Sequence, residues 1–314
     1  MKVAVLFTGA LRTIRKTLPF LKQNVLLNKE TVMFACCQND SDVPDTEWEQ
    51  WLAEEIGTAL LSFQWFQPSD PHWLSTRDRQ LANMAIGAST QHYLQTSGSM
   101  IEYYQLQTAY TAMCAHEFTS HAKYEYVVRV RTDTIFAHPI DFHWLQWTEE
   151  EIAQRLDSIR AQQPDATDSR LLQYFMTSVI ADDTIDNLAN FTGCCHLGRS
   201  PEPALSELRE YLLHGSYILT FRKNLLYIAR RDLFYCIPAL GSLYGLFTSP
   251  HTLPHFRWNA ESQFQAACYH SNVAIFDYCT PLEDQSLYLY DEQRYFDTDF
   301  KIHNLLILFC LVRR

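Results

Sequence analysis

The chain of 314 residues is poor in glycine, of which it holds only nine. It contains no GxGxxG and no GxxxxGK[ST] pattern, so neither a dinucleotide-binding turn nor a P-loop is present. Basic residues are also scarce, because 25 Lys and Arg stand against 36 Asp and Glu, for a formal net charge of -11. This balance argues against a nucleic-acid-binding protein. A chain this acidic needs local arginines or a metal ion to bind an anionic substrate.

Cysteine spacing of the CxxC type, which would suggest a zinc or redox site, is also missing. The nine cysteines are an odd number and include the neighbouring pairs Cys36/Cys37 and Cys194/Cys195. We expect reduced, mostly buried thiols in a reducing compartment. The first strand begins at once and leaves no room for a signal peptide, so the sequence predicts a cytoplasmic protein.

No apolar run approaches the roughly 18 residues of a membrane span. The segment from Leu305 to Val312, followed by Arg313 and Arg314, is the most apolar part of the C-terminal region. It is expected to pack on the core as a strand or helix; the alternative is a tail that makes peripheral contact with a membrane.

The chain is rich in core-forming residues, 47% hydrophobic and 14% aromatic. Its first third alternates short apolar runs with segments of helical periodicity, which favours a parallel sheet with right-handed crossovers. The predicted strands are Lys2–Thr8, Thr31–Cys37 and Leu61–Phe66, and the predicted helices contain Ile14 to Val25, Trp48 to Leu60 and a long segment from Ser99.

The stretch from Tyr124 to Phe136, YEYVVRVRTDTIF, predicts a buried strand that ends in a carboxylate. Alternation along a strand places Arg129, Arg131 and Asp133 on one face. Ligands bind beyond the carboxyl ends of the strands in open α/β sheets, so Arg131 and Asp133 are candidates to bind a phosphorylated ligand. The alternative is an internal arginine–aspartate ion pair that only closes the strand.

Two motifs in this order resemble the GT-A glycosyltransferases, and most closely the GT-A-like families of bacterial surface-polysaccharide clusters and large DNA viruses. In those families the first strand ends in an (S/T)Gx(L)R turn and a later strand has the pattern YDYVIRxRxD. Here the turn is Thr8-Gly9-Ala10-Leu11-Arg12 and the strand is Tyr124 to Asp133. The resemblance covers mainly residues 1–140, with a weaker match over Trp258 to Tyr269.

The resemblance implies an α/β fold with a mostly parallel sheet flanked by helices. Residues 1–140 would form the nucleotide-sugar-binding half, and residues 141–314 the acceptor-side half with a C-terminal extension. The implied activity is transfer of a sugar from a nucleotide-diphosphate donor to a glycan or other hydroxyl acceptor, in polysaccharide biosynthesis. Thr8, Gly9 and Arg12 would line the nucleotide pocket, and Arg131 with Asp133 would bind the diphosphate.

Such enzymes usually neutralise the leaving diphosphate with a divalent metal held on an Asp-x-Asp pair. In this chain Arg131 stands in place of the first Asp. Asp133 alone can hold Mn²⁺ or Mg²⁺, with water and phosphate oxygens completing the shell. Alternatively, the guanidinium groups of Arg131 and Arg12 bind the diphosphate directly. The replacement also leaves open a catalytically inactive module that binds glycan or a partner enzyme.

The acidic candidates for deprotonating an acceptor hydroxyl are Asp183, Asp186 and Glu261. Asp186 follows a predicted strand over Leu171–Ala181, in a loop where catalytic groups are often displayed. Glu261 opens a predicted helix after Asn259, where the helix dipole alone favours an acid.

Two literal Asp-x-Asp triplets occur elsewhere, Asp40-Ser41-Asp42 and Asp297-Thr298-Asp299. Asp40 follows the second predicted strand and can approach the base or ribose of a nucleotide. His303 is a further candidate to complete a metal shell.

Overall fold

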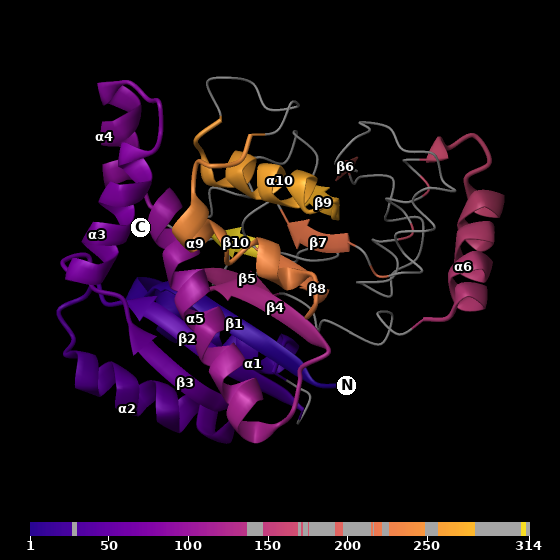
Figure 1. Cartoon of the computed structure of the whole chain (residues 1–314). Helices are drawn as coiled ribbons and strands as arrows, with labels where there is room; N and C mark the ends of the chain where they lie inside the picture. The colour runs from indigo at the N-terminus through magenta and orange to yellow at the C-terminus, as the bar shows by residue number, and fades with distance from the viewer. Residues whose placement is uncertain are drawn as a thin grey trace, which may run out of the picture.

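The computed structural model describes residues 1–26, 30–136, 147–168, 171, 175, 192–196, 215, 217–221, 226–248, 257–279 and 309–311. Strands and helices alternate through the first half of the chain, as the apolar periodicity predicts (Figure 1). The strands are β1 (Val3–Ala10), β2 (Thr31–Gln38), β3 (Leu60–Trp65), β4 (Tyr126–Arg131), β5 (Thr134–Phe136), β6 (Thr192–His196), β7 (Tyr217–Phe221), β8 (Leu226–Arg230), β9 (Ala274–Cys279) and β10 (Phe309–Leu311).

The α-helices of the described part include the four predicted over Ile14 to Val25, over Trp48 to Leu60, from Ser99 and at Glu261. The described α-helices are α1 (Ile14–Asn24), α2 (Asp45–Ile56), α3 (Pro71–Ala82), α4 (Ala88–Thr96), α5 (Ser99–Ser120), α6 (Glu149–Gln162), α9 (Leu240–Leu243) and α10 (Ala260–His270). Among the described helices, none is long and apolar enough to cross a bilayer.

The central sheet has eight strands in the order β3-β2-β1-β4-β8-β7-β9-β6. Strands β3, β2, β1 and β4 run parallel, and β7 runs parallel to β9. The pairs β4–β8, β7–β8 and β6–β9 are antiparallel. The predicted α/β class with a mostly parallel sheet flanked by helices is therefore confirmed. The sheet continues from β4 into strands that follow residue 140, and the division at that residue stays a prediction.

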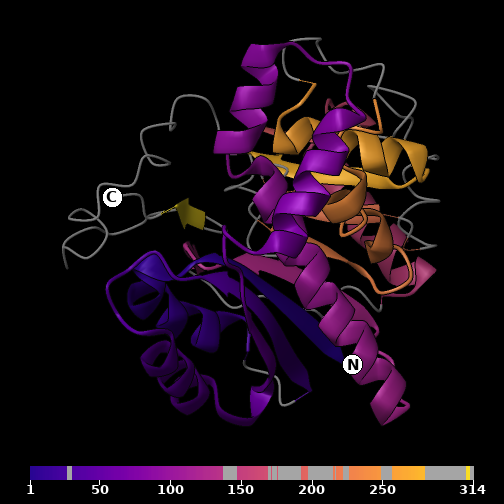
Figure 2. The same cartoon turned by 60° about the vertical axis from the view of Figure 1, so that its left-hand side comes forward.

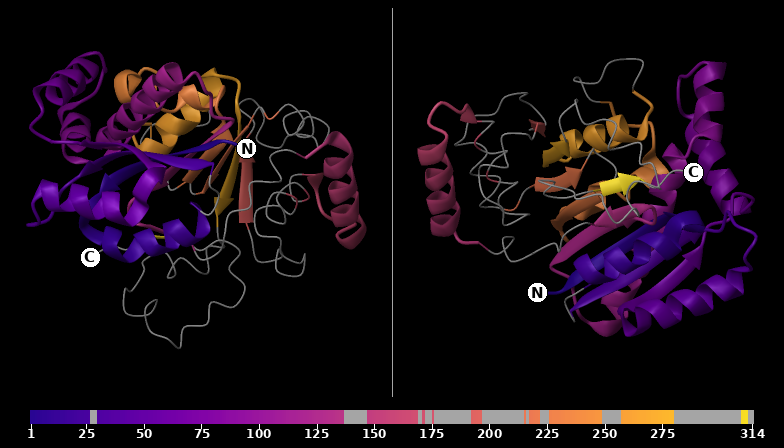
Figure 3. Two further views of the ribbon diagram at one scale, coloured as in Figure 1. Left: turned by 90° about the horizontal axis from the view of Figure 1, so that it is seen from below. Right: turned by 180° about the vertical axis from the view of Figure 1, so that it is seen from behind.

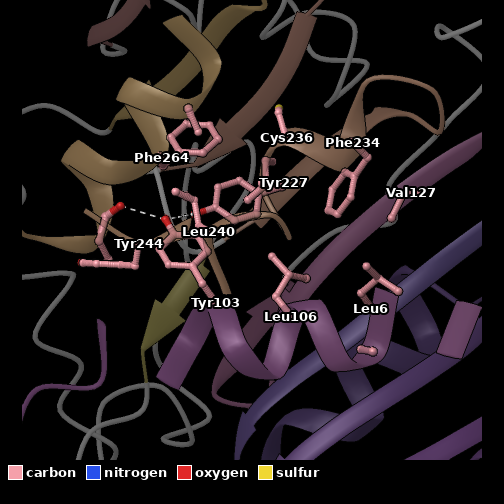
Figure 4. Packing of buried hydrophobic residues seen from close by; sticks show 14 of the residues in the cluster. Leu6, Tyr103, Leu106, Val127, Tyr227, Phe234, Cys236, Leu240, Tyr244 and Phe264 are labelled. Carbon is pink, nitrogen blue, oxygen red and sulfur yellow. Dashed lines mark hydrogen bonds between the residues drawn. The ribbon is translucent and has the colours of Figure 1, made fainter. Parts of the chain in front are cut away.

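Helices cover both faces of the sheet, and each face carries its own apolar core (Figure 3). Helices α1 and α2 pack on one face, while α3, α4, α5, α9 and α10 pack on the other. Helix α6 lies to the side of the sheet, and its apolar residues belong to the cluster that contains α1 and α2 (Figure 1). The long helix α5 lies across the sheet (Figure 2). In the apolar core beneath α5, the hydroxyl of Tyr103 lies 3.3 Å from that of Tyr227 on β8. The ring of Tyr227 stacks on Phe264 of α10 (Figure 4).

The stretch from Tyr124 to Phe136 is two strands and not the single predicted strand. The chain turns at Thr132 and Asp133, because hydrogen bonds from tertiary neighbours hold Thr132 against the end of β1. The backbone N–H of Thr132 donates to Thr8 O at 3.0 Å, and its side-chain hydroxyl donates to Ala10 O at 2.6 Å. Strand β5 then leaves the main sheet and pairs antiparallel with β10.

The strand predicted over Leu171–Ala181 is wrong at Leu171 and Phe175, which are helical and buried; the rest of that segment lies outside the described residues. Helix α1 begins at Ile14 and contains Pro19. Other predictions are confirmed. The helix predicted to open at Glu261 is α10, β10 is a strand within the C-terminal apolar segment, and Cys36, Cys37, Cys114, Cys236 and Cys268 are free thiols.

Candidate functional site

A cleft of about 420 Å³ opens at the carboxyl ends of β1, β2 and β4, where open α/β sheets bind ligands. Its floor is formed by these strand ends, and its walls by α4, the first turns of α5 and the first turn of α10. The lining residues are Thr8, Gly9, Ala10, Arg12, Gln38, Tyr93, Ser97, Gly98, Ser99, Ile101, Glu102, Gln105, Arg129, Arg131, Thr132, Asp133, Ala260 and Glu261.

The floor of the cleft depends on glycine at position 9. Gly9 has a φ of +132°, and a Cβ there would lie 2.6 Å from the hydroxyl oxygen of Thr132. Only glycine adopts this conformation without strain, and only glycine leaves space for Thr132. Thr17 of α1 donates a 2.6 Å hydrogen bond to the Thr132 carbonyl. The ends of β1 and β4 are thereby held together, which brings Arg12 next to Asp133.

Asp133 lies between two guanidinium groups. Arg131 Nε and Nη2 donate to Asp133 Oδ1 and Oδ2 at 3.0 and 3.1 Å. Arg12 Nη2 lies 3.9 Å from Asp133 Oδ2. The Asp133 side chain is only 6% exposed, while the Arg12 side chain is 39% exposed. Arg12 makes no hydrogen bond among the described residues, so it is the more available cation for a ligand.

The carboxylate of Glu102 on α5 neutralises the charges of Arg129 and Arg131 on β4. Arg129, which is 1% exposed, places Nη2 3.1 Å from Glu102 Oε1 on α5, and its Nε donates to Thr8 Oγ1 at 3.2 Å. Arg131 Nη1 lies 4.0 Å from the other Glu102 oxygen. Arg129 and Arg131 therefore share one face of β4, as the alternation predicts. Each finds the anionic partner that burial demands.

The ionic network keeps Arg131 charged. Burial lowers the pKa of Arg131, but the negative charges of Asp133 and Glu102 outweigh this effect and raise the pKa overall. A permanently charged guanidinium fork at a strand end matches the geometry of phosphate oxygens.

Glu261 lines the cleft from the first turn of α10. The Asn259 side chain caps this helix by accepting from Ser262 N at 2.8 Å, and Tyr103 OH donates to the Ala260 carbonyl at 2.8 Å. These bonds fix the start of α10 against α5. The cleft therefore brings Glu261 into the same space as Arg12, Arg131 and Asp133.

Not every residue named from the sequence lies in the cleft. Thr8, Gly9, Arg12, Arg131, Asp133 and Glu261 line it. Asp40 does not; it is exposed in the loop after β2, and Gln38 at the end of that strand lines the cleft instead. Asp183, Asp186, His303 and the triplet Asp297–Asp299 lie outside the described residues.

The residues present do not fit a divalent metal well. Both Asp133 oxygens already accept hydrogen bonds from Arg131, and a metal there would lie beside two guanidinium cations. Glu102 is paired with the buried Arg129. In the part of the chain that the structure describes, no group of three His, Cys, Asp or Glu side chains could hold a metal ion. The arrangement favours the second alternative left open by the sequence, in which guanidinium groups bind the diphosphate.

Sequence reasoning missed Glu102, Gln105 and Gln38 as cleft residues. Two arginines in one buried strand do demand a second carboxylate. Its position on α5 depends, however, on how that helix crosses the sheet, which local periodicity does not encode.

No family model and no curated protein matches the chain. Among solved structures, it is similar to the mannosyltransferase Ktr4p from S. cerevisiae in complex with GDP. The identity is 12% and the TM-score 0.29, over 86% of this chain and 62% of that one. Core-mannan synthase A from Aspergillus fumigatus, in its Mn/GDP form, is 10% identical with a TM-score of 0.33, over 85% of this chain and 69% of that one. The chain thus spans less than two thirds of the length of Ktr4p.

Proposed function

We propose that this chain is a glycosyltransferase of the GT-A kind, which moves a sugar from a nucleotide-diphosphate donor to a hydroxyl acceptor. The observation that carries the proposal is the meeting of Arg12, Arg131 and Asp133 with Glu261 in one cleft at the carboxyl ends of β1 and β4. A cation-lined floor opposite a carboxylate suits a reaction that has an anionic leaving group and a hydroxyl nucleophile.

In this reaction the bond between the anomeric carbon of the sugar and the diphosphate oxygen breaks, and its electron pair stays on the nucleoside diphosphate. Arg12 and the outward N–H groups of Arg131 stabilise that growing negative charge. Asp133 positions both guanidinium groups. No step is assigned to a metal, because the donor set around Asp133 does not suit one.

The acceptor oxygen forms the new bond to the anomeric carbon, and its proton must pass to a base. We assign this role to Glu261, which lines the cleft from the first turn of α10. Asp186, the other candidate, stays a prediction.

A catalytically inactive binding module is the second candidate function. The observation that favours it is the Asp133 carboxylate, which is occupied by Arg131 and would not hold the usual metal. Such a module binds a nucleotide sugar or glycan in the same cleft but releases no nucleoside diphosphate.

Release of nucleoside diphosphate from UDP- and GDP-sugars separates the two candidates. We expect slow donor hydrolysis without acceptor, abolished by Asp133→Ala in a variant with unchanged circular dichroism. Asp232→Ala is the matched control, because Arg230 and Asp232 form an ion pair of the same spacing at the end of β8, at 2.9 Å and outside the cleft. Binding without hydrolysis by the wild-type protein would support the inactive module.

A further inference from the structure

Gln105 is buried in the wall of the cleft without a partner. Its side chain lies on α5, the residue is 3% exposed, and it lines the cleft. Among the residues that the structure describes, no side-chain hydrogen bond of Gln105 is present. The amide atoms of Gln105 are not among the sealed polar atoms of the described fold, so they face the open space of the cleft. A ligand in the cleft can supply the missing hydrogen bonds.

The direction of Gln105 follows from its neighbours on α5. Tyr103 faces β8, where its hydroxyl lies 3.3 Å from that of Tyr227. Thr108 lies on another flank, near the Cys36 side chain of β2. Side chains three positions apart share a helix flank, so Gln105 lies between Glu102, which reaches the arginines of β4, and Thr108, which lies near β2.

The cleft therefore has two chemically different ends. Strand β1 separates β4 from β2 in the sheet. The β4 side carries the charged groups Arg131 and Asp133. The β2 side carries Gln38, another carboxamide whose side chain makes no hydrogen bond in the described part of the chain, and Gln105 lines the wall between the two sides. A ligand that fits both ends carries a phosphate on one side and a neutral group with hydrogen-bond donors and acceptors on the other.

We propose that Gln105 is a specificity residue that hydrogen-bonds the nucleobase of the donor, an inference that rests on the proposed function. A carboxamide presents one acceptor and an N–H₂ donor in one plane. It therefore matches a base edge on which a donor and an acceptor lie side by side, as Gln and Asn match adenine in DNA. Arg12 and Arg131 bind the diphosphate of the same nucleotide.

Isothermal titration with UDP, GDP and inorganic pyrophosphate tests the assignment. Gln105→Met keeps the length of the side chain and removes its hydrogen bonds. We expect this variant to bind the preferred nucleoside diphosphate about tenfold more weakly, the loss of one or two hydrogen bonds, and to bind pyrophosphate as the wild type does. Arg12→Gln should lower the affinity for both the nucleoside diphosphate and pyrophosphate. Gln95→Met, at an exposed position of α4 outside the cleft, is the matched control.

Thermal unfolding adds a readout that separates recognition from a structural role. An unpartnered amide contributes nothing to the fold, so Gln105→Met should melt at or above the wild-type temperature. Equal nucleotide affinity in wild type and Gln105→Met, equal losses for nucleotide and pyrophosphate, or a lower melting temperature would each overturn the assignment. Failure of the wild type to bind either nucleotide would instead overturn the proposed function, and the assignment with it.

Discussion

Arg131 donates two hydrogen bonds to Asp133, two residues further along the chain, at 3.0 and 3.1 Å. The same carboxylate lies 3.9 Å from Arg12, which follows β1. One buried carboxylate thus positions two guanidinium groups where the parallel strands β1 and β4 end. This relationship ties the two sequence motifs together in space.

Asp133→Asn should separate binding from turnover. The variant removes the anion that competes with phosphate for Arg12 and Arg131, so its affinity for the nucleoside diphosphate in EDTA should equal or exceed that of the wild type. Donor hydrolysis should fall at least tenfold, because Arg131 loses its orientation. Calorimetry and a nucleoside diphosphate release assay measure the two quantities. Binding that requires Mn²⁺ in the wild type and disappears in the variant would show that Asp133 holds a metal instead.

Arg12→Gln should weaken nucleoside diphosphate binding by about 10- to 100-fold, the range expected for hydrogen bonds to a charged group. Arg15→Gln is the control. Arg15 lies three residues further on, is 55% exposed, and pairs with Glu47 outside the cleft at 3.5 Å. Titration of both variants against one nucleotide makes the comparison. Equal affinities in the two variants would contradict the role given to Arg12.

Gly9→Ala should destabilise the protein by about 1–3 kcal/mol, because the new Cβ meets Thr132 and the backbone is strained at a φ of +132°. Gly87→Ala is the matched control, since no atom lies within 4 Å of a Cβ built there. The free energy of unfolding in urea measures both. A loss for Gly9→Ala no larger than that for Gly87→Ala would show that the junction of β1 and β4 tolerates a side chain.

Stability should fall in alkaline solution. Burial raises the pKa of the Cys36 thiol from 9.0 to about 12, and it raises the pKa of Tyr103 and Tyr227 well above 10.0. Above pH 9.0 the unfolded chain releases a thiol proton that the folded chain keeps, so this contribution is complete below pH 9.0 and is lost as the pH rises towards about 12. The urea midpoint should therefore drop across this interval, and less steeply in Cys36→Ala. A urea midpoint that stays constant from pH 9.0 to about 12 would contradict the burial of these thiol and phenol groups in their neutral form.

The sequence predicted the strands and helices whose positions follow from local apolar periodicity. The apolar runs of β1 and β2 and the spacing of Ile14, Leu18 and Leu21 on α1 follow directly from periodicity. The placement of Arg131 at a strand end also follows, because side chains alternate along a strand. Arg12 enters the same cleft because β1 and β4 are adjacent, which the sequence suggests only through the order of its two motifs.

The rest depends on tertiary contacts. The break between β4 and β5 comes from hydrogen bonds that Thr132 makes to β1 and α1, which a continuous strand-like pattern conceals. Glu102 and Gln105 enter the cleft because α5 crosses the sheet at one particular angle. Gln38 lines the cleft where Asp40 was expected, and Asp40 is exposed in the loop after β2.

The most direct test of the central claim, that guanidinium groups at the ends of β1 and β4 receive the diphosphate of an activated sugar, is calorimetric titration. The wild-type protein is titrated with a panel of UDP- and GDP-sugars, once in EDTA and once with Mn²⁺. We predict binding of at least one donor at one site per chain, with the same affinity in both conditions. No binding by any donor in either condition would contradict the account.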